Sequence, residues 1–308
     1  RNTTEATNIV AEGLELEGKI LVPKMSHHSE QLPWRRKAET EGLELEFIPT
    51  EKGKLDMDAA REMIDEDTAL VSVSHISNVF GCRNPVEELA EIAHENDAYI
   101  FVDGAQSVPR IPVDVQDMDI DFLGFSGHKM CGPTGTGALY GKKEILEEMK
   151  PLLVGGGMIE TVEEEKVKNG EVPDRFEAGT PNIAGAVGLA KAAEYIQKVG
   201  LENIDEHERK LNRMMIEGLK EIEGVEIHAP EDETPSVVSF TMEEAHPHDV
   251  AEVLNTEAVA VRAGHHCAQP QHQELDLSGT VRASPYFYNT EEEVEKFLEA
   301  VKKVKEVF

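Results

Sequence analysis

A lysine that follows an apolar run is the first residue in this sequence with evident chemical potential. Lys129 lies just after the run that begins at Phe122, and the segment 130–137 behind it is rich in glycine and proline. This pattern is typical of a buried strand that ends in a loop. Burial lowers the pKa of an amine, and the neutral amine is the nucleophile that forms Schiff bases. For Lys129 alone, the competing interpretation is a solvated lysine in a turn.

An acidic residue ends a second predicted strand. Asp103 directly follows the apolar run 98–102, and open α/β sheets bind ligands beyond the carboxyl ends of their strands. Taken alone, Asp103 could equally be a helix N-cap or a magnesium ligand. Beside a Schiff-base lysine, however, it supplies what a pyridoxal phosphate site requires. The carboxylate keeps the pyridine nitrogen protonated, and the ring then withdraws electrons from the substrate.

The thiol of Cys267 is the third reactive group. It lies in the polar segment 262–270, Arg-Ala-Gly-His-His-Cys-Ala-Gln-Pro. Such a partly exposed and electropositive setting lowers the pKa of a thiol and favours the thiolate. A lone cysteine is more often a small buried hydrophobic residue, but a segment this polar cannot form a core strand. Three consecutive residues converge poorly on one metal ion, so His265, His266 and Cys267 do not predict a zinc site.

Two further groups could bind anions. Arg282 lies on a further predicted strand and is expected to point to the cleft that holds Lys129 and Asp103. A guanidinium is the expected ligand of an α-carboxylate. Segment 3–11 predicts a helix with a threonine at its cap. A helix N-terminus binds phosphate through free N–H groups, so Thr4 is a candidate phosphate ligand.

Alternating strands and helices must position these groups. The apolar runs predict strands at 19–22, 45–48, 69–73, 98–102, 122–125 and 138–140, and a crossover helix at 85–96. This βαβ pattern predicts a parallel sheet. Long helices at 183–199 and 201–222 follow, then strands at 225–228, 236–240 and 258–261 and a helix at 246–255. The expected division is a large domain, 1–196, and a smaller C-terminal α+β domain, 197–308, that carries Cys267.

Together the motifs resemble the class V aminotransferase superfamily of pyridoxal phosphate enzymes. The resemblance rests on Val102-Asp103-Gly104-Ala105-Gln106 and on Phe125-Ser126-Gly127-His128-Lys129. The segment 262–268 narrows it to the cysteine desulfurases of the SufS-like branch. The resemblance implies the fold type I of pyridoxal phosphate-dependent transferases, an α/β fold with a large, mainly parallel sheet between helices. It also implies that an N-terminal segment of the family is missing from this chain, which starts inside a motif.

The resemblance implies a role for each site residue. Lys129 holds the cofactor, Asp103 binds its ring nitrogen, and His27 stacks on the ring and assists proton transfer, while the adjacent His28 is expected to pack or to point to solvent. Thr180 reaches the phosphate of the other subunit, which implies a homodimer. The expected ligands of the phosphate and of the ring hydroxyl are Thr4, Ser126, His128, Asn78 and Gln106, and the expected substrate-binding residues are Arg282 and Arg262.

The implied reaction converts L-cysteine to L-alanine and leaves a persulfide on Cys267. That sulfur would pass to an acceptor protein of the SufE or SufU kind for iron–sulfur cluster assembly. A selenocysteine lyase would share nearly every motif, whereas a transaminase of the same fold would have no use for Cys267. An inactive scaffold subunit is the remaining alternative, favoured by the missing segment and disfavoured by the intact Lys129, Asp103 and Cys267.

The composition bounds the partners and the compartment. The 308 residues have a formal net charge of −31, which excludes the basic face that nucleic-acid binding needs. Self-repulsion of this size favours a salt-loving source, with an acidic mesophilic protein as the alternative. The three cysteines do not form a pattern of pairs, so we expect a reducing cytoplasm. No signal peptide or membrane-spanning stretch is predicted.

Overall fold

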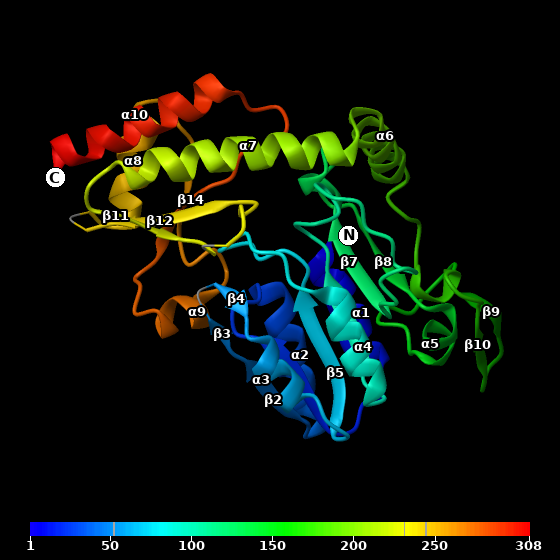
Figure 1. Cartoon of the computed structure of the whole chain (residues 1–308). Coiled ribbons are helices and arrows are strands. Elements are labelled where there is room, and N and C mark those ends of the chain that lie inside the picture. Colours follow the sequence, from blue (N-terminus) through cyan, green and yellow to red (C-terminus); the bar gives the residue numbers. More distant parts are fainter. Residues whose placement is uncertain (52, 231, 244) are drawn as a thin grey trace.

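A computed structural model of the chain describes residues 1–51, 53–230, 232–243 and 245–308. Two β-sheets, each with its own helices, make up most of it (Figure 1). The larger sheet has the strand order β2-β1-β5-β6-β7-β8. Its strands are β1 (Lys19–Pro23), β2 (Glu44–Ile48), β5 (Thr68–Ser74), β6 (Tyr99–Asp103), β7 (Phe122–Ser126) and β8 (Gly137–Gly141).

The larger sheet is parallel except at one edge. β2, β1, β5, β6 and β7 are parallel to one another, and β8 is antiparallel to β7. The predicted α/β fold with a mainly parallel sheet is therefore confirmed. Because the carboxyl ends of parallel strands meet at one edge, the segments after β1, β5, β6 and β7 gather there.

Helices cover both faces of this sheet. On one face, α1 (Thr3–Gly13) and α2 (His28–Glu41) contribute Val10 and Trp34 to a core with Phe101. On the other face lie α3 (Met57–Met63) and α4 (Val86–Glu95). The buried residues of α4 recur at helical spacing, and Leu89 packs in a core with Ile100. Burial of each large apolar side chain contributes roughly 1.5–3 kcal/mol to the stability of the fold. The helix layers on both faces therefore fix the positions of the strands and of their ends.

The second sheet is antiparallel, in the order β11-β12-β14-β13. Its core joins Phe240 of the sheet to Leu211, Val250 and Phe297 of three helices. The helix α10 begins with a capping box between Thr290 and Glu293. The bounds are α7 (Leu201–Lys220), β11 (Val225–His228), β12 (Val238–Met242), α8 (Pro247–Thr256), β13 (Arg262–Gly264), β14 (Thr280–Ala283) and α10 (Glu291–Val307).

The remaining elements connect or extend these two parts. The hairpin of β9 and β10 projects from the body at the right of Figure 1, and Val162 and Val167 on it are exposed. The other bounds are β3 (Thr50–Glu51), β4 (Lys54–Leu55), η1 (Gly127–Lys129), α5 (Lys143–Glu148), β9 (Ile159–Val162), β10 (Val167–Asn169), η2 (Asp174–Phe176), α6 (Ile183–Val199) and α9 (Gln269–Glu274).

Two local predictions were wrong. The strand expected at 258–261 is not formed, because α8 ends at Thr256 and Ala258 adopts a left-handed turn with φ of 56°. The strand there is β13, which begins at Arg262. The helix α1 is capped by Asn2 rather than by a threonine, and the Asn2 side chain accepts from Glu5 N at 3.0 Å.

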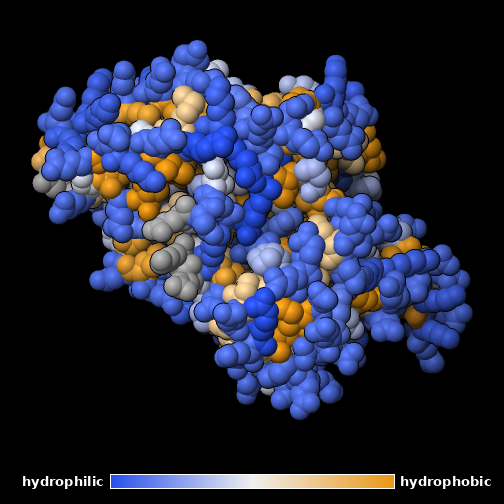
Figure 2. All heavy atoms as spheres, in the orientation of Figure 1, coloured by the Kyte–Doolittle hydropathy of each residue, from blue (hydrophilic) through white to orange (hydrophobic). Residues whose placement is uncertain are grey.

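The surface is dominated by hydrophilic side chains, as Figure 2 shows for one face of the molecule. Among the described residues, no helix has the length and apolar character needed to cross a membrane.

Candidate active site

The carboxyl edge of the larger sheet encloses a cavity of about 200 Å³. Lys129 reaches it from η1 behind β7, and Asp103 and Ser74 reach it as the last residues of β6 and β5. The structure therefore brings the predicted lysine and acid to one place. The other predicted site residues that line this cavity are Thr4, His27, Asn78, Gln106, Ser126 and His128.

The Lys129 amine lies in an environment that disfavours its charge. Burial lowers the pKa of Lys129, and the guanidinium groups of Arg282 and Arg110 lower it further, while Asp103 and Cys267 act in the opposite direction. A depressed pKa makes the neutral, nucleophilic amine more accessible. The glycine before His128 is sterically required, because a Cβ on Gly127 would lie 2.5 Å from Oγ1 of Thr136.

Asp103 lines the cavity but is almost fully buried. It is only 5% exposed, and its Oδ1 accepts a hydrogen bond from Ala105 N at 2.8 Å. Burial raises the pKa of Asp103, and the nearby Lys129 cation opposes that shift. A buried carboxylate of this kind is suited to bind a protonated ring nitrogen.

The N-terminus of α1 forms one wall of the cavity. The amide and hydroxyl of Thr3 contact Oγ of Ser126 at 3.0 and 2.9 Å. Thr4 and His128 are exposed beside this contact and line the same cavity. The amides of Thr3 and Glu5 already donate to Ser126 and Asn2, so this wall offers a phosphate group the exposed Thr4 and the positive end of the helix dipole.

The two adjacent histidines have different positions. His27 lines the cavity, and its Nδ1 accepts from Ser29 N at 3.0 Å as the cap of α2. Burial, followed by the charge of Lys129, lowers the pKa of His27 to about 4. The amide of His28 donates to the Cys267 oxygen at 2.7 Å, and its Nε2 accepts from Gln269 N at 3.2 Å. His28 thus holds the cysteine segment, a role that sequence reasoning missed because it depends on a contact 239 or more residues away.

The Cys267 side chain is exposed at the top of an unusual turn. His266 and Cys267 both have a positive φ, of 50° and 60°, which is uncommon for residues other than glycine. Nε2 of His266 lies 3.0 Å from both the oxygen and the Oγ1 of Thr280, and this contact anchors the turn. Burial lowers the pKa of His266 to about 3, so the ring is neutral. Among the described residues, no cluster of His, Cys, Asp and Glu could hold a metal ion.

Four predicted residues lie outside the cavity lining: Cys267, Arg262, Thr180 and Arg282. Cys267 is close enough that its thiolate would raise the pKa values of Lys129 and Arg282. Arg262 on β13 and Thr180 are both exposed and do not line the cavity. Their roles remain predictions.

Arg282 is partly buried between the two sheets. Its Nη1 donates to the Asn78 oxygen at 2.8 Å and its Nε to Oγ of Ser284 at 3.0 Å. Burial lowers the pKa of Arg282 to about 10, which still leaves it charged at neutral pH. A desolvated guanidinium near the cavity is suited to bind a carboxylate.

A buried pair behind Gln106 was also missed by sequence reasoning. Nη1 of Arg110 donates to Oε1 of Gln106 at 2.9 Å, and its Nε donates to Oε2 of Glu208 at 2.8 Å. Glu208 lies on α7, so this network connects a cavity residue to the helix of the second sheet. No pattern in the sequence relates Arg110 to a residue so distant along the chain.

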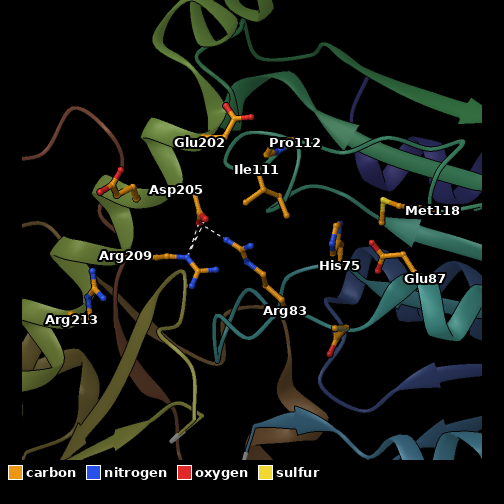
Figure 3. A pocket seen from close by; sticks show the side chains of 12 residues that line it. His75, Arg83, Glu87, Ile111, Pro112, Met118, Glu202, Asp205, Arg209 and Arg213 are labelled. Carbon is orange, nitrogen blue, oxygen red and sulfur yellow. Dashed lines mark hydrogen bonds and ion pairs between the residues drawn. The ribbon is translucent and has the colours of Figure 1, made fainter.

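A second cavity, of about 530 Å³, lies between α7 and the segment after β5 (Figure 3). Asp205 on its wall pairs with both Arg83 and Arg209. None of the predicted site residues lines it. The smaller cavity at the sheet edge is therefore the candidate active site.

Comparison with known proteins agrees with this geometry. A family model described as aminotransferase class-V matches residues 1–297. A cysteine desulfurase of Haloferax volcanii is 47% identical over the whole chain and 74% of its own length. The apo structure of a cysteine desulfurase from Thermococcus onnurineus NA1 has a TM-score of 0.95 and 44% identity, covering all of this chain and 78% of that one. The cysteine desulfurase CsdA of Escherichia coli, at 35% identity, has a TM-score of 0.96 over all of this chain and 78% of its own.

Proposed function

Because this chain belongs to the class V aminotransferase family, we propose that it is a pyridoxal phosphate-dependent cysteine desulfurase that converts L-cysteine to L-alanine. The observation that carries the proposal is the placement of Lys129 and Asp103 in one cavity, with Cys267 exposed on a segment that acts electrostatically on Lys129. The names of the relatives support the same activity. The SufS-like subtype is part of this proposal.

The residues around the cavity fit pyridoxal phosphate. A buried amine with a lowered pKa suits its aldehyde, and a buried carboxylate suits its ring nitrogen. Asn78 and Gln106 would bind the ring hydroxyl, and His27 would cover the ring face. The phosphate would lie at the N-terminus of α1, where the expected ligands are Thr4, Ser126 and His128.

When bound, the cofactor supplies an electron sink for the substrate α-carbon. Arg282, together with Arg262, would bind the substrate carboxylate. The neutral amine of Lys129 is suited to move the α-proton, because burial favours its uncharged form. His27 is neutral at physiological pH, since its pKa is about 4, and can accept or donate a hydrogen bond beside it.

Cys267 would take the sulfur. Its thiolate attacks the substrate sulfur and forms a sulfur–sulfur bond. The bond between that sulfur and the substrate β-carbon breaks, its electron pair remains with the carbon, and a proton completes alanine. The persulfide on an exposed side chain is open to an acceptor protein. We propose an acceptor of the SufE or SufU kind, a role in iron–sulfur cluster assembly and a cytoplasmic location.

A second copy of the chain completes the proposal. Thr180 is exposed and outside the cavity of its own chain, so it is free to reach the phosphate of a partner in a homodimer. We also propose that residues 1–196 and 197–308 form the two domains, since each part contains its own sheet and core.

An anaerobic assay in high salt tests the proposal. The protein is supplied with pyridoxal phosphate, L-cysteine and a reductant, and alanine, sulfide and the visible absorption of the bound cofactor are followed. We expect cofactor absorption and product from the wild type, absorption without product from Cys267→Ala, and neither from Lys129→Ala. Absorption without product in the wild type would reject the desulfurase activity, and no absorption would favour a scaffold subunit.

A further inference from the structure

The mechanism above leaves one buried acid unused. Glu30, in the first turn of α2, is 0% exposed. Its Oε1 accepts from Oγ of Ser72 at 3.0 Å, and its Oε2 accepts from Oγ of Ser74 at 2.6 Å. Among the described residues, Glu30 has no cationic partner within salt-bridge distance. A fully buried carboxylate without a cation is costly, and such a group usually takes up a proton instead.

A single residue, Ser74, separates Glu30 from the cavity of the candidate active site. Ser74, which binds it, is in register with Asp103 on the neighbouring parallel strand. Residues in register on neighbouring strands direct their side chains to the same face of a sheet, and Ser74 and Asp103 both line the cavity. Glu30, Ser74 and Asp103 therefore form a continuous group, which we name the acid arm.

The charges around the acid arm decide which carboxyl group holds a proton. Burial, and then the negative charge of Asp103, raise the pKa of Glu30 to about 8. Asp103 is the titratable group that acts on Glu30, and the hydroxyls of Ser72 and Ser74 donate hydrogen bonds to the Glu30 carboxyl. Asp103, by contrast, has the Lys129 cation and the Ala105 amide to stabilise its charge.

Two buried carboxyl groups this close do not both ionise readily. The asymmetry of their partners assigns the charge to Asp103 and the proton to Glu30. We propose that Glu30 is a neutral positioning residue of the cofactor site, which acts through Ser74 to limit the acid arm to the single negative charge of Asp103. This inference rests on the proposed function, in which Asp103 binds the ring nitrogen.

The proposal has a consequence for alkaline pH. When Glu30 loses its proton, the acid arm carries a second negative charge beside the ring-nitrogen position and near Lys129. That charge would raise the proton affinity of the ring nitrogen and of the Lys129 nitrogen. The bound cofactor should therefore show an alkaline spectral transition that belongs to Glu30 and that a neutral residue at position 30 cannot produce.

The first test needs no cofactor. Infrared spectra of the full chain, with its glutamates carbon-13 labelled, should show a protonated carboxyl band at pH 7 that disappears as the pH rises through about 8. Glu30→Gln, a neutral substitute of similar shape, should keep the contribution of Glu208, whose pKa is raised to about 7, and should lose the component that titrates near pH 8. Glu39→Gln, an exposed acid of the same helix, should retain it. A Glu30 that is ionised at pH 7, shown by the absence of any labelled band lost in Glu30→Gln, would overturn the inference.

The second test uses the protein loaded with pyridoxal phosphate. The alkaline transition in cofactor absorption should vanish in Glu30→Gln and persist in Glu39→Gln. A transition that is the same in Glu30→Gln and the wild type overturns the inference but leaves the desulfurase activity intact. Failure of the wild type to bind the cofactor instead rejects the proposed function, and the infrared band of the unloaded protein then still decides whether Glu30 is protonated.

Discussion

The side-chain amide of Asn78 donates a hydrogen bond of 2.7 Å to the main-chain oxygen of His266, next to the reactive cysteine. The main-chain oxygen of Asn78 in turn accepts from Arg282 at 2.8 Å. Asn78, in the segment that follows β5, therefore positions both the cysteine turn and Arg282, the candidate ligand of the substrate carboxylate. Since His266 and Cys267 adopt strained left-handed conformations, the turn depends on such external contacts.

Replacing Asn78 should release the cysteine turn. In Asn78→Ala the His266 oxygen loses its buried donor, which costs about 1–3 kcal/mol and should raise the alkylation rate of Cys267 several-fold. Persulfide formation should slow, because the turn that carries the thiol is no longer fixed by Asn78. Asn96→Ala, which removes an amide contact at the end of α4, is the matched control and should leave Cys267 alkylation unchanged. Equal rates in both variants and the wild type would show that the turn needs no support from Asn78.

The buried pair of Arg110 and Glu208 should make stability depend on pH in an unusual direction. Burial raises the pKa of Glu208 to about 7, although Arg110 opposes the shift. The folded state therefore holds the Glu208 proton more tightly than the unfolded state, in which the pKa is about 4.3. The contribution of the Glu208 proton to the free energy of unfolding is complete below about pH 4.3. It is lost as the pH rises to about 7, at up to roughly 1.4 kcal/mol per pH unit.

Urea unfolding across this pH range checks the effect. Glu208→Gln should remove the part of the pH dependence between about 4.3 and 7. Arg110→Met should destabilise the protein by about 3–5 kcal/mol at neutral pH, because it leaves Glu208 buried without its cation. The double variant Arg110→Met with Glu208→Met should recover most of that loss. A pH profile of Glu208→Gln that matches the wild type would show that Glu208 does not titrate in this range.

The site residues that lie at or just after the end of a strand were predictable. Lys129 follows its strand directly and Asp103 ends its own, so strand periodicity and the parallel arrangement were enough to bring them together. The resemblance to a known family supplied residues such as Asn78 and Gln106, whose single positions carry no signal of their own. Both residues line the cavity, and their contact with the ring hydroxyl stays a prediction.

The contacts between distant segments could not be predicted. His28 binds the cysteine segment, and Arg110 binds Glu208, through geometry that only the packed fold determines. Glu30 lies in the polar helix α2, where an acid would be expected to face solvent. Its complete burial depends on the serines of β5, which the sequence alone does not place beneath it. The prediction of a threonine cap on α1 was wrong for a related reason: Thr3 binds Ser126, and Asn2 caps the helix instead.

The three cysteines should differ in reactivity. Burial raises the pKa of Cys82 to about 12 and also raises that of Cys131, although Cys131 is exposed. Brief treatment of the native protein with iodoacetamide should therefore label Cys267 first, Cys131 more slowly and Cys82 only after unfolding. Peptide mass spectrometry gives the order directly. Labelling of Cys131 ahead of Cys267 would contradict the assignment of Cys267 as the reactive thiol.

The net charge of −31 should make the folded protein depend on salt. Acids such as Glu163, Glu164 and Glu165 are exposed together near the β9–β10 hairpin, and like charges at the surface repel until salt screens them. The Debye length falls from about 30 Å at 0.01 M to about 3 Å at 1 M. The melting temperature should therefore rise with sodium chloride, steeply up to about 0.5 M and little beyond. Sucrose controls for general exclusion from the surface, since it stabilises folded proteins without screening charge. A melting temperature that is equal at low and molar salt, or that sucrose raises as much as sodium chloride does, would show that self-repulsion is not what limits stability.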